Sequence, residues 1–287
     1  MRGYDQQMLT NVSRIRLGPF ILLPAGLWLL IFMVLPMAIL IVFSLGTRDD
    51  LGKVVLGFNF DNYLRFFYGP YLKALWRSLA LASMNTVVCL GFGFLCAMWL
   101  AFVVPKERQN LLVTLIVAPL WTSFLLRIYA WMTILRPTGL LTQAFETIGI
   151  SNLPSILYTP WAVLLGMVYN YLPYMILPLF ASLEKLDRRL LEAAADLGAT
   201  PFDAFVRITL PLSFGGIVAG VTMVFVPSLG DYVTPDLLGG AKTMFIGNLI
   251  QNQFLTVRDW TFGSAVSTIL IIIVAIAIAV YVKWGQK

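Results

Sequence analysis

The 287-residue sequence contains no histidine, only two cysteines and few charged side chains, which make up 12% of its residues. Without histidine, the chain lacks the commonest zinc ligand, the usual general base and the usual proton carrier near neutral pH. Soluble domains carry about 25% charged residues, because their surface must be covered largely by polar groups. The scarcity of charge therefore excludes an ordinary soluble domain.

The two cysteines, Cys89 and Cys96, lie seven residues apart in one hydrophobic segment. On a helix they would share a face but be separated by about 10 Å along the axis, which is too far for a disulfide. We expect two buried thiols that carry no information about redox compartment.

Motifs for nucleotide binding and catalysis are missing as well. No stretch of the chain matches G-x-x-x-x-G-K-[ST], the loop that cradles phosphates in many ATPases. The hydrophobic segments hold neither a nucleophile beside a base nor a cluster of metal ligands. These absences argue against an intramembrane enzyme, and we expect no cofactor on this chain.

Hydrophobic residues account for 59% of the sequence, and the mean hydropathy is +0.84. A helix needs about 20 apolar residues to cross a bilayer. We expect an all-α polytopic membrane protein, with an N-terminal segment (residues 1–19) and one transmembrane domain (20–287). Its six predicted spans are Phe20–Ser44, Leu79–Val104, Leu111–Leu135, Trp161–Leu183, Leu212–Leu229 and Phe262–Val282.

The distribution of lysine and arginine predicts the orientation of these spans. Eleven of the 20 basic residues fall on the side of both termini, eight on the other side, and Arg127 lies within the third span. Cytoplasmic loops are enriched in positive charge. We therefore expect both termini in the cytosol. Nucleic-acid binding is not favoured, since no basic stripe is interleaved with exposed aromatic residues.

The loop between the fourth and fifth spans, residues 184–211, is the most informative segment. Its first part, Leu190–Leu197, is rich in alanine and leucine and predicts a helix. Gly198 is expected to end this helix in the left-handed conformation. The charged run that precedes it, which contains Glu184, Asp187 and Arg188, is expected to be a solvated face.

A second short helix is predicted immediately after the glycine. Thr200 suits the N-cap, Pro201 the first helical position and Asp203 the first turn, where a carboxylate favours the helix dipole. We expect this helix to stop before Pro211.

The second helix presents an apolar face formed by Phe202, Phe205 and Val206, but it is too short to span a bilayer. Three partners for this face fit the pattern. It could lie on the bilayer surface, pack on the spans of its own chain, or enter a groove on another protein.

The run EAAADLGATPFDAFVRITLP resembles the conserved cytosolic loop of ABC importer permeases, in which EAA, a glycine and I-x-L-P recur at this spacing. In that family the loop forms the coupling helix, which fits a cleft on the ATPase subunit. The resemblance implies a coupling role for the matching residues and the two phenylalanines, namely Glu192, Ala193, Ala194, Gly198, Phe202, Phe205, Ile208, Leu210 and Pro211.

Four further stretches look like the permeases of spermidine/putrescine importers, of the first-permease type. They are TRDD (47–50), PLWTSFLLRIYAW (119–131), GDYVTPDLLGG (230–240) and RDW (258–260). The resemblance implies a bacterial inner-membrane subunit that works with two ATPase subunits, a second permease and a periplasmic solute-binding protein. ATP and Mg²⁺ would be bound by the ATPase. Permeases for opines and other small organic solutes share parts of these patterns.

A path for a polyamine is expected to offer carboxylates and aromatic faces, which attract ammonium groups. The alternative for each aromatic residue is an interfacial position, which tyrosine and tryptophan favour whatever the function. For Asp231 the alternative is an ion pair with Arg127. The candidates are Trp121, Tyr169, Tyr171, Tyr174, Asp231 and Tyr232.

Arg127 argues against a simple cation path, because a fixed guanidinium repels a polycation. We expect it to reach outward, cap a helix end, or pair with Asp231 or Glu146. Asn85 and Asn170 are expected to form hydrogen bonds between helices. An ion-coupled secondary transporter or channel is the main rival, but these proteins often bury acids or histidines deep in the bilayer.

Overall fold

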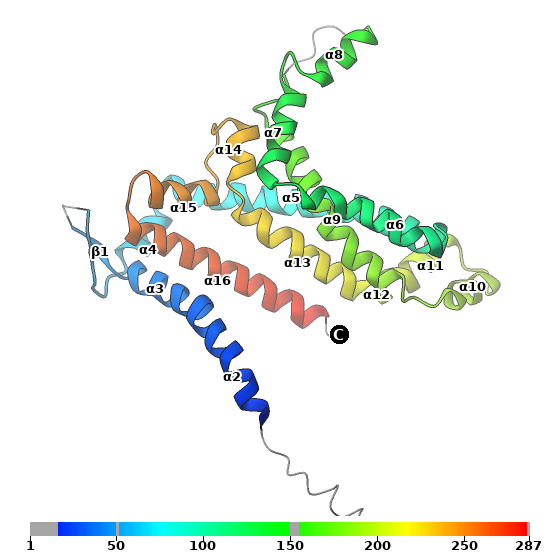
Figure 1. Ribbon diagram of the computed structural model, residues 1–287, viewed down its shortest axis with the longest axis horizontal. Coiled ribbons are helices and arrows are strands. Elements are labelled where there is room, and N and C mark those ends of the chain that lie inside the picture. Colours follow the sequence, from blue (N-terminus) through cyan, green and yellow to red (C-terminus); the bar gives the residue numbers. More distant parts are fainter. Residues whose placement is uncertain (1–16, 50–51, 150–154, 286–287) are drawn as a thin grey trace, which may run out of the picture.

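The computed structural model describes residues 17–49, 52–149 and 155–285 of the chain (Figure 1). Most of the predicted N-terminal segment 1–19 lies outside these residues. Helices dominate, and the exception is a hairpin of two short antiparallel strands. The short elements are β1 (Thr47–Arg48), β2 (Val54–Val55), α4 (Asp61–Phe67), α8 (Leu140–Thr147), α10 (Arg188–Asp196), α14 (Val233–Gly239) and α15 (Ile246–Leu255).

Four helical segments in the described chain are long and apolar enough to cross a membrane, and the number rises to six if two bent pairs each count as one span. The predicted all-α membrane architecture is confirmed, whereas a count of six continuous spans is not. The first segment, Leu23–Ser44, includes part of α2 (Leu17–Leu29) and all of α3 (Leu35–Ser44). The second, Pro70–Val103, is formed by α5 (Pro70–Met98) and a π-helical turn, η2 (Trp99–Val103). The third is α9 (Pro160–Leu183), and the fourth is Trp260–Tyr281 within α16 (Trp260–Gly285).

The third predicted span is not one helix. It is split into α6 (Lys106–Val117), with a 3₁₀ turn that ends at Trp121, and α7 (Phe124–Leu135). The segment Lys106–Trp121 meets the segment Phe124–Thr147 at 89°, so α7 and α8 (Leu140–Thr147) turn away from the line of α6 (Figure 1). Pro119 lies in the 3₁₀ turn, and Ser123 has an extended backbone with ψ of 136°. A proline that lacks its amide donor, followed by extended residues, cannot continue a helix.

The fifth predicted span begins two residues later than expected. Helix α13 (Phe214–Gly230) follows a 67° bend at Ser213, which separates it from the segment Pro201–Leu212. Helix α13 itself is 17 residues long.

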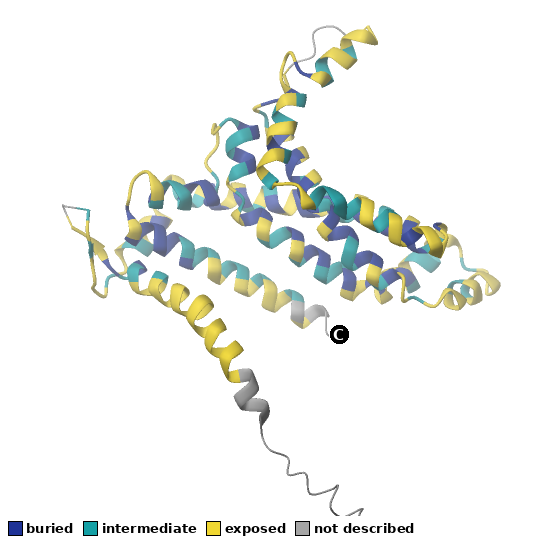
Figure 2. Cartoon of the chain, viewed as in Figure 1, coloured by how far each residue is buried: buried dark blue, intermediate teal, exposed yellow. Residues whose placement is uncertain are grey.

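Helices α5, α9 and α13 form the core of the bundle, where buried residues concentrate (Figure 2). Glycine permits the close contacts: a Cβ on Gly93 of α5 would lie 2.8 Å from Met175 of α9. The Asn85 amide donates to Ser228 Oγ at 2.8 Å, which joins α5 to α13 as predicted. The prediction for Asn170 was wrong, since its buried amide has no hydrogen-bond partner among the described residues.

The first long segment lies apart from this core and is exposed along most of its length (Figure 2). None of its most apolar window is buried within the chain, whereas 56% of the corresponding window in α9 is buried. Its chief neighbour is α16, which α3 contacts.

Candidate functional site

The loop predicted between the fourth and fifth spans forms an elbow of two short helices at one end of the bundle (Figure 1). Its first arm is α10, and its second arm is the helical segment Pro201–Leu212. Gly198 joins the arms with φ of +82°, and a Cβ built there would meet no atom within 4 Å. The glycine is therefore required by backbone conformation rather than by crowding within the chain.

A capping box begins the second arm, as the sequence predicts. The Thr200 hydroxyl accepts from the Asp203 amide at 3.2 Å, and the Asp203 carboxylate accepts from the Thr200 amide at 3.3 Å. The hydrogen bonds from the Thr200 hydroxyl and amide, with a smaller contribution from Arg207, hold the pKa of Asp203 below its ordinary value. The charged carboxylate therefore favours the start of this helix near neutral pH.

The second arm does not stop before Pro211 as expected but continues to Leu212. Residues 205–209 form a π-helical turn, in which the Leu210 amide donates to the Phe205 carbonyl. Because hydrogen bonds have already shifted register here, the missing amide of Pro211 does not end the helix.

The apolar face of the second arm divides between two environments. The Phe205 ring packs edge-on against Phe94 of α5, with ring centroids 5.5 Å apart. Phe202 is 72% exposed, and Leu197 at the elbow is 89% exposed. The interpretation that the face packs on its own helices therefore holds for Phe205 and not for Phe202. Of the other residues matched to the coupling motif, Glu192, Ala193, Leu210 and Pro211 are exposed, and Ala194 and Ile208 are half-buried.

The charged run before α10 is not a simple solvated face. The Asp187 carboxylate caps α10 by accepting from the Arg189 amide at 3.0 Å. Arg188 Nη2 donates to the carbonyl of Ala101 at 2.6 Å, which ties the run to the end of the second span. An aspartate directly before a predicted helix could have indicated the cap. The carbonyl that Arg188 binds leaves no signal in the local sequence.

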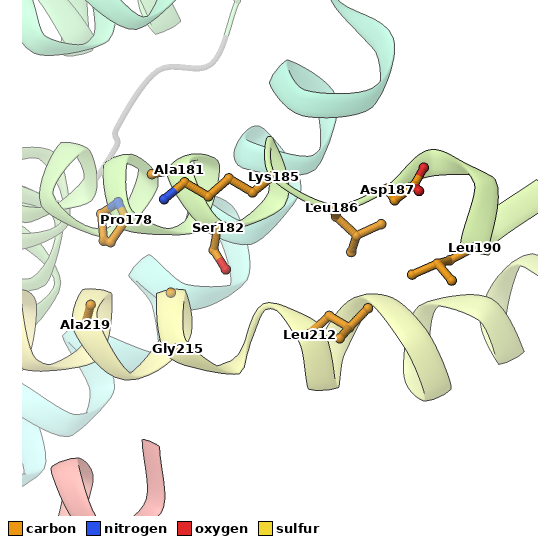
Figure 3. Close-up of a pocket in the computed structure, with 11 residues that line it drawn as sticks. Pro178, Ala181, Ser182, Lys185, Leu186, Asp187, Leu190, Leu212, Gly215 and Ala219 are labelled. Atoms are coloured by element: carbon orange, nitrogen blue, oxygen red, sulfur yellow. The ribbon is translucent and has the colours of Figure 1, made fainter. Parts of the chain in front are cut away.

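A cleft of about 610 Å³ lies beside the elbow, between the end of α9 and the start of α13 (Figure 3). Lys185 and Asp187 line it from one side, and Leu212 and Gly215 from the other. The elbow is therefore not packed against the fifth span along this side.

A second candidate site forms where α13 ends. Asp231 Oδ2 lies 3.4 Å from the Tyr171 hydroxyl of α9 and 2.6 Å from Thr234 Oγ1, and Asp231 Oδ1 accepts from the Thr234 amide at 3.1 Å. We refer to Tyr171, Asp231 and Thr234 as the acid site. Of the six residues predicted for a solute path, the structure brings Tyr171 and Asp231 together.

The other four predicted residues lie outside these hydrogen bonds. Tyr169 packs edge-on against Trp131 of α7, with ring centroids 5.5 Å apart. Tyr174, Tyr232 and Trp121 have exposed rings. Tyr174 follows Tyr171 by three positions on α9 and so lies near the same helix face.

Arg127 does not form an ion pair with an acid among the described residues. The predicted pairing of Arg127 with Asp231 or Glu146 was therefore wrong. The ion pairs found among the described residues are Arg65–Asp259 and Asp203–Arg207. Arg127 Nε and Nη1 are buried without a hydrogen-bond partner in the described chain, and the guanidinium carbon lies 5.8 Å from the centre of the Phe124 ring. The carboxylate of Asp231 is therefore bound by neutral hydroxyl and amide donors.

Sequence reasoning missed several polar residues around the acid site. These include Thr234, which binds Asp231, and Asn248, whose side-chain amide donates to Asp236 at 2.6 Å. A threonine three residues after an aspartate is a recognisable local pair, but Asn248 reaches Asp236 from a different helix. No group of three or more potential metal ligands occurs in the part of the chain that the structure describes.

A bundle of apolar helices with a glycine-hinged elbow between its fourth and fifth predicted spans fits one class of protein, the membrane subunits of solute importers. The profile of the family described as "Binding-protein-dependent transport system inner membrane component" matches residues 91–285. The chain belongs to this family, which makes it a multi-pass inner-membrane transport subunit and not an enzyme.

Individual relatives agree with this assignment. The chain is 42% identical over 255 residues to the spermidine/putrescine transport system permease protein PotB of Escherichia coli (strain K12), with 88% of this chain and 92% of that protein covered. The PotB protein of Haemophilus influenzae is 42% identical over 257 residues, with 89% and 90% covered. A chain of a bacterial alginate ABC transporter shares the fold, with a TM-score of 0.74 and 18% identity over 98% of both chains.

Proposed function

We propose that this chain forms part of the path for a polyamine, such as spermidine or putrescine, in an ATP-driven importer. The observation that carries the proposal is the 42% identity to spermidine/putrescine permeases over 88% of the chain. This similarity extends through the acid site and the elbow, because the matched segment covers most of the sequence.

The acid site suits a polycation. A carboxylate that accepts only from neutral donors can still pair with an ammonium group, whereas a carboxylate paired with arginine is already neutralised. Aromatic rings nearby add cation–π contacts of about 0.5–2 kcal/mol each. In this proposal Asp231 attracts the amine, and Tyr171, Tyr174 and Tyr232 present rings to the alkyl and ammonium groups.

ATP would act through partner chains. We propose that the elbow and both termini face the cytosol, and that two ATPase subunits bind ATP and Mg²⁺ on that side. The exposed Phe202 and Leu197 support docking at the elbow, because an exposed apolar cluster on a short helix fits a groove on a partner. Closure of the ATPase dimer would then switch the spans between two packed arrangements.

A second permease and a periplasmic solute-binding protein complete the proposed complex. The first long segment supports a membrane partner, since no residue of its apolar window is buried within this chain. The solute-binding protein would deliver the polyamine at the end of the bundle opposite the elbow, beside α4, α15 and the β1–β2 hairpin (Figure 1).

Reconstituted complexes test this function directly. The purified complex in proteoliposomes, supplied with radiolabelled spermidine, the solute-binding protein and ATP, should accumulate spermidine and hydrolyse ATP in response to it. Asp231→Asn should reduce uptake at least tenfold, because it removes the charge while preserving side-chain shape. Asp236→Asn is the matched control, since its carboxylate binds Asn248 outside the acid site.

Two results would contradict the proposal. One is full-speed spermidine entry without ATP or the ATPase subunits, which would indicate a channel or a secondary transporter. The other is ATP hydrolysis that responds to another solute and not to polyamines, which would keep the importer class but replace its substrate.

A further inference from the structure

The second span ends in a wide turn whose carbonyls are bound by side chains. In η2 the Val104 amide donates to the Trp99 carbonyl, five residues back. Carbonyl groups at a helix end lack intrahelical donors and need other partners. Gln109 Nε2 donates to the carbonyls of Leu100 and Val104 at 2.9 and 3.1 Å. Of the three carbonyls between them in sequence, that of Ala101 accepts from Arg188.

Arg188 differs from Gln109 because it comes from a distant part of the chain. Gln109 is five to nine positions from the carbonyls that it binds, whereas Arg188 is 87 positions from Ala101 and lies in the first turn of α10. Its guanidinium also lies 5.9 Å from the centre of the Phe102 ring. A cation is favoured at the carbonyl end of a helix. The hydrogen bond from the charged Arg188 guanidinium to the Ala101 carbonyl is therefore charge-assisted.

The second arm of the elbow contacts the same helical span. Phe205 packs against Phe94, which precedes Ala101 by seven residues. Seven residues are two helical turns, so the two contacts lie on one face of the span and about 10 Å apart along its axis. Both arms of the elbow are therefore attached to the second span, one by a hydrogen bond and the other by a ring contact.

Clefts flank the first arm on both sides. On one side, the 610 Å³ cleft separates Leu190 of α10 from Leu212 at the end of the second arm (Figure 3). On the other side, a cleft of about 500 Å³ is lined by Ala101, Phe102 and Arg188. The long side chain of Arg188 crosses from α10 to η2, where the backbones do not pack closely.

We propose that Arg188 is a positioning residue that transmits movement of the elbow to the second span. The inference rests on the proposed coupling function of the elbow. When a partner displaces the elbow, the Arg188–Ala101 hydrogen bond pulls on η2, and the Phe205–Phe94 contact pushes on the same helix two turns away. Without Arg188, the first arm would move without the span.

The test compares transport with ATP consumption in the reconstituted complex, so that loss of coupling is distinguished from loss of folding. Arg188→Ala should reduce the amount of solute imported per ATP at least fivefold, while ATP hydrolysis stays within twofold of the unaltered complex. Arg188→Lys should restore most of the ratio, because an ammonium can donate to the same carbonyl. Arg189→Ala is the matched control, since the neighbouring guanidinium is exposed and makes no hydrogen bond or ion pair among the described residues.

A distance measurement gives a readout that catalysis does not affect. Spin labels on Ala195→Cys and Val103→Cys, both exposed positions, report the separation of the first arm from η2 after Cys89 and Cys96 are replaced by alanine. The distribution should be narrow in the parent and broader with Arg188→Ala.

The outcomes separate this inference from the proposed function. If Arg188→Ala leaves both the transport ratio and the distance distribution unchanged, while Gly198→Asp still abolishes uptake, the coupling elbow stands and the role of Arg188 is wrong. If uptake and hydrolysis fall in equal proportion without broadening, the role of Arg188 is also wrong. Normal ATP-driven uptake by Gly198→Asp would instead overturn the coupling function of the elbow.

Discussion

Arg65 Nη1 lies 2.8 Å from Asp259 Oδ2, which joins two residues separated by 194 positions at the end of the bundle opposite the elbow. The Arg65 guanidinium carbon also lies 4.1 Å from the centre of the Phe262 ring. The same carboxylate accepts from the Phe262 amide and the Thr261 hydroxyl at the start of α16. One aspartate therefore caps the last span and holds α4 against it.

This ion pair predicts a pH-dependent stability. Burial of Asp259 raises its pKa, but hydrogen bonds from the Phe262 amide, Arg65 and Thr261 outweigh burial and hold the pKa below its ordinary value. The pair therefore stabilises the fold above about pH 4, the ordinary value for aspartate, and this contribution is lost as pH falls through the lower pKa of the folded state. Thermal unfolding of the purified complex from pH 7 to pH 3 measures the loss.

Asp259→Asn should lower the free energy of unfolding at pH 7 by about 1–3 kcal/mol, because it removes the charge from a hydrogen-bonded carboxylate. The difference from the parent should shrink as pH falls. Asp61→Asn, at an exposed aspartate bound to Asn59, is the control. A difference that stays constant over this pH range would contradict the assignment of Asp259 as the titrating group.

Substitution of Gly198 is predicted to impair transport because its backbone adopts the left-handed conformation, which residues with a side chain disfavour. At φ of +82°, an L-residue is disfavoured by about 1–2 kcal/mol even though the space beside it is empty. Gly198→Asp should abolish ATP-driven uptake, and Gly198→Ala should reduce it, with normal amounts of both proteins in the membrane. Ala195→Asp adds the same charge to an exposed helical position and should retain uptake. Equal loss in that control would point to charge rather than conformation.

Two adjacent glycines at the start of α13 should respond differently to alanine. A Cβ on Gly216 would lie 2.6 Å from Ser182 Cβ and 2.8 Å from the Pro178 carbonyl oxygen, both on α9. A Cβ on Gly215 would meet nothing within 4 Å. Gly216→Ala should therefore destabilise the fold by about 1–3 kcal/mol, because α9 and α13 must move apart.

Gly215→Ala should be neutral or stabilising by up to about 1 kcal/mol, because alanine is the better helix former. Unfolding of the two variants in increasing denaturing detergent provides the comparison. Similar destabilisation by both would contradict the close packing of α9 on α13.

The two buried asparagines offer another contrast. Asn85→Ala should cost about 0.6 kcal/mol and at most about 1.7 kcal/mol, the range measured for hydrogen bonds between membrane helices. Asn170→Ala should be neutral or stabilising, because a buried amide without a partner costs free energy in the folded state. The same unfolding measurement applies. A larger loss for Asn170→Ala than for Asn85→Ala would contradict the absence of a hydrogen-bond partner for the Asn170 amide.

Features that depend on neighbours in the chain could be predicted from the sequence. The hydrophobic segments, the turn at Gly198 and the cap at Thr200 all follow from residues within a few positions of one another. The break after Pro119 was missed even though its signal is local, because the apolar character of Leu111–Leu135 outweighed one proline in the prediction. Length and composition determine that a segment enters the membrane, and backbone geometry determines whether it stays straight.

By itself, the sequence determined that this protein is a helical membrane subunit with a glycine-hinged loop of the importer type. The tertiary structure alone decided which distant groups meet. Tyr171 contacts Asp231 across 60 positions, Arg188 binds Ala101 across 87, and Arg65 pairs with Asp259 across 194. The reason is that each contact depends on how whole helices pack, and helix packing depends on the shapes of many side chains at once.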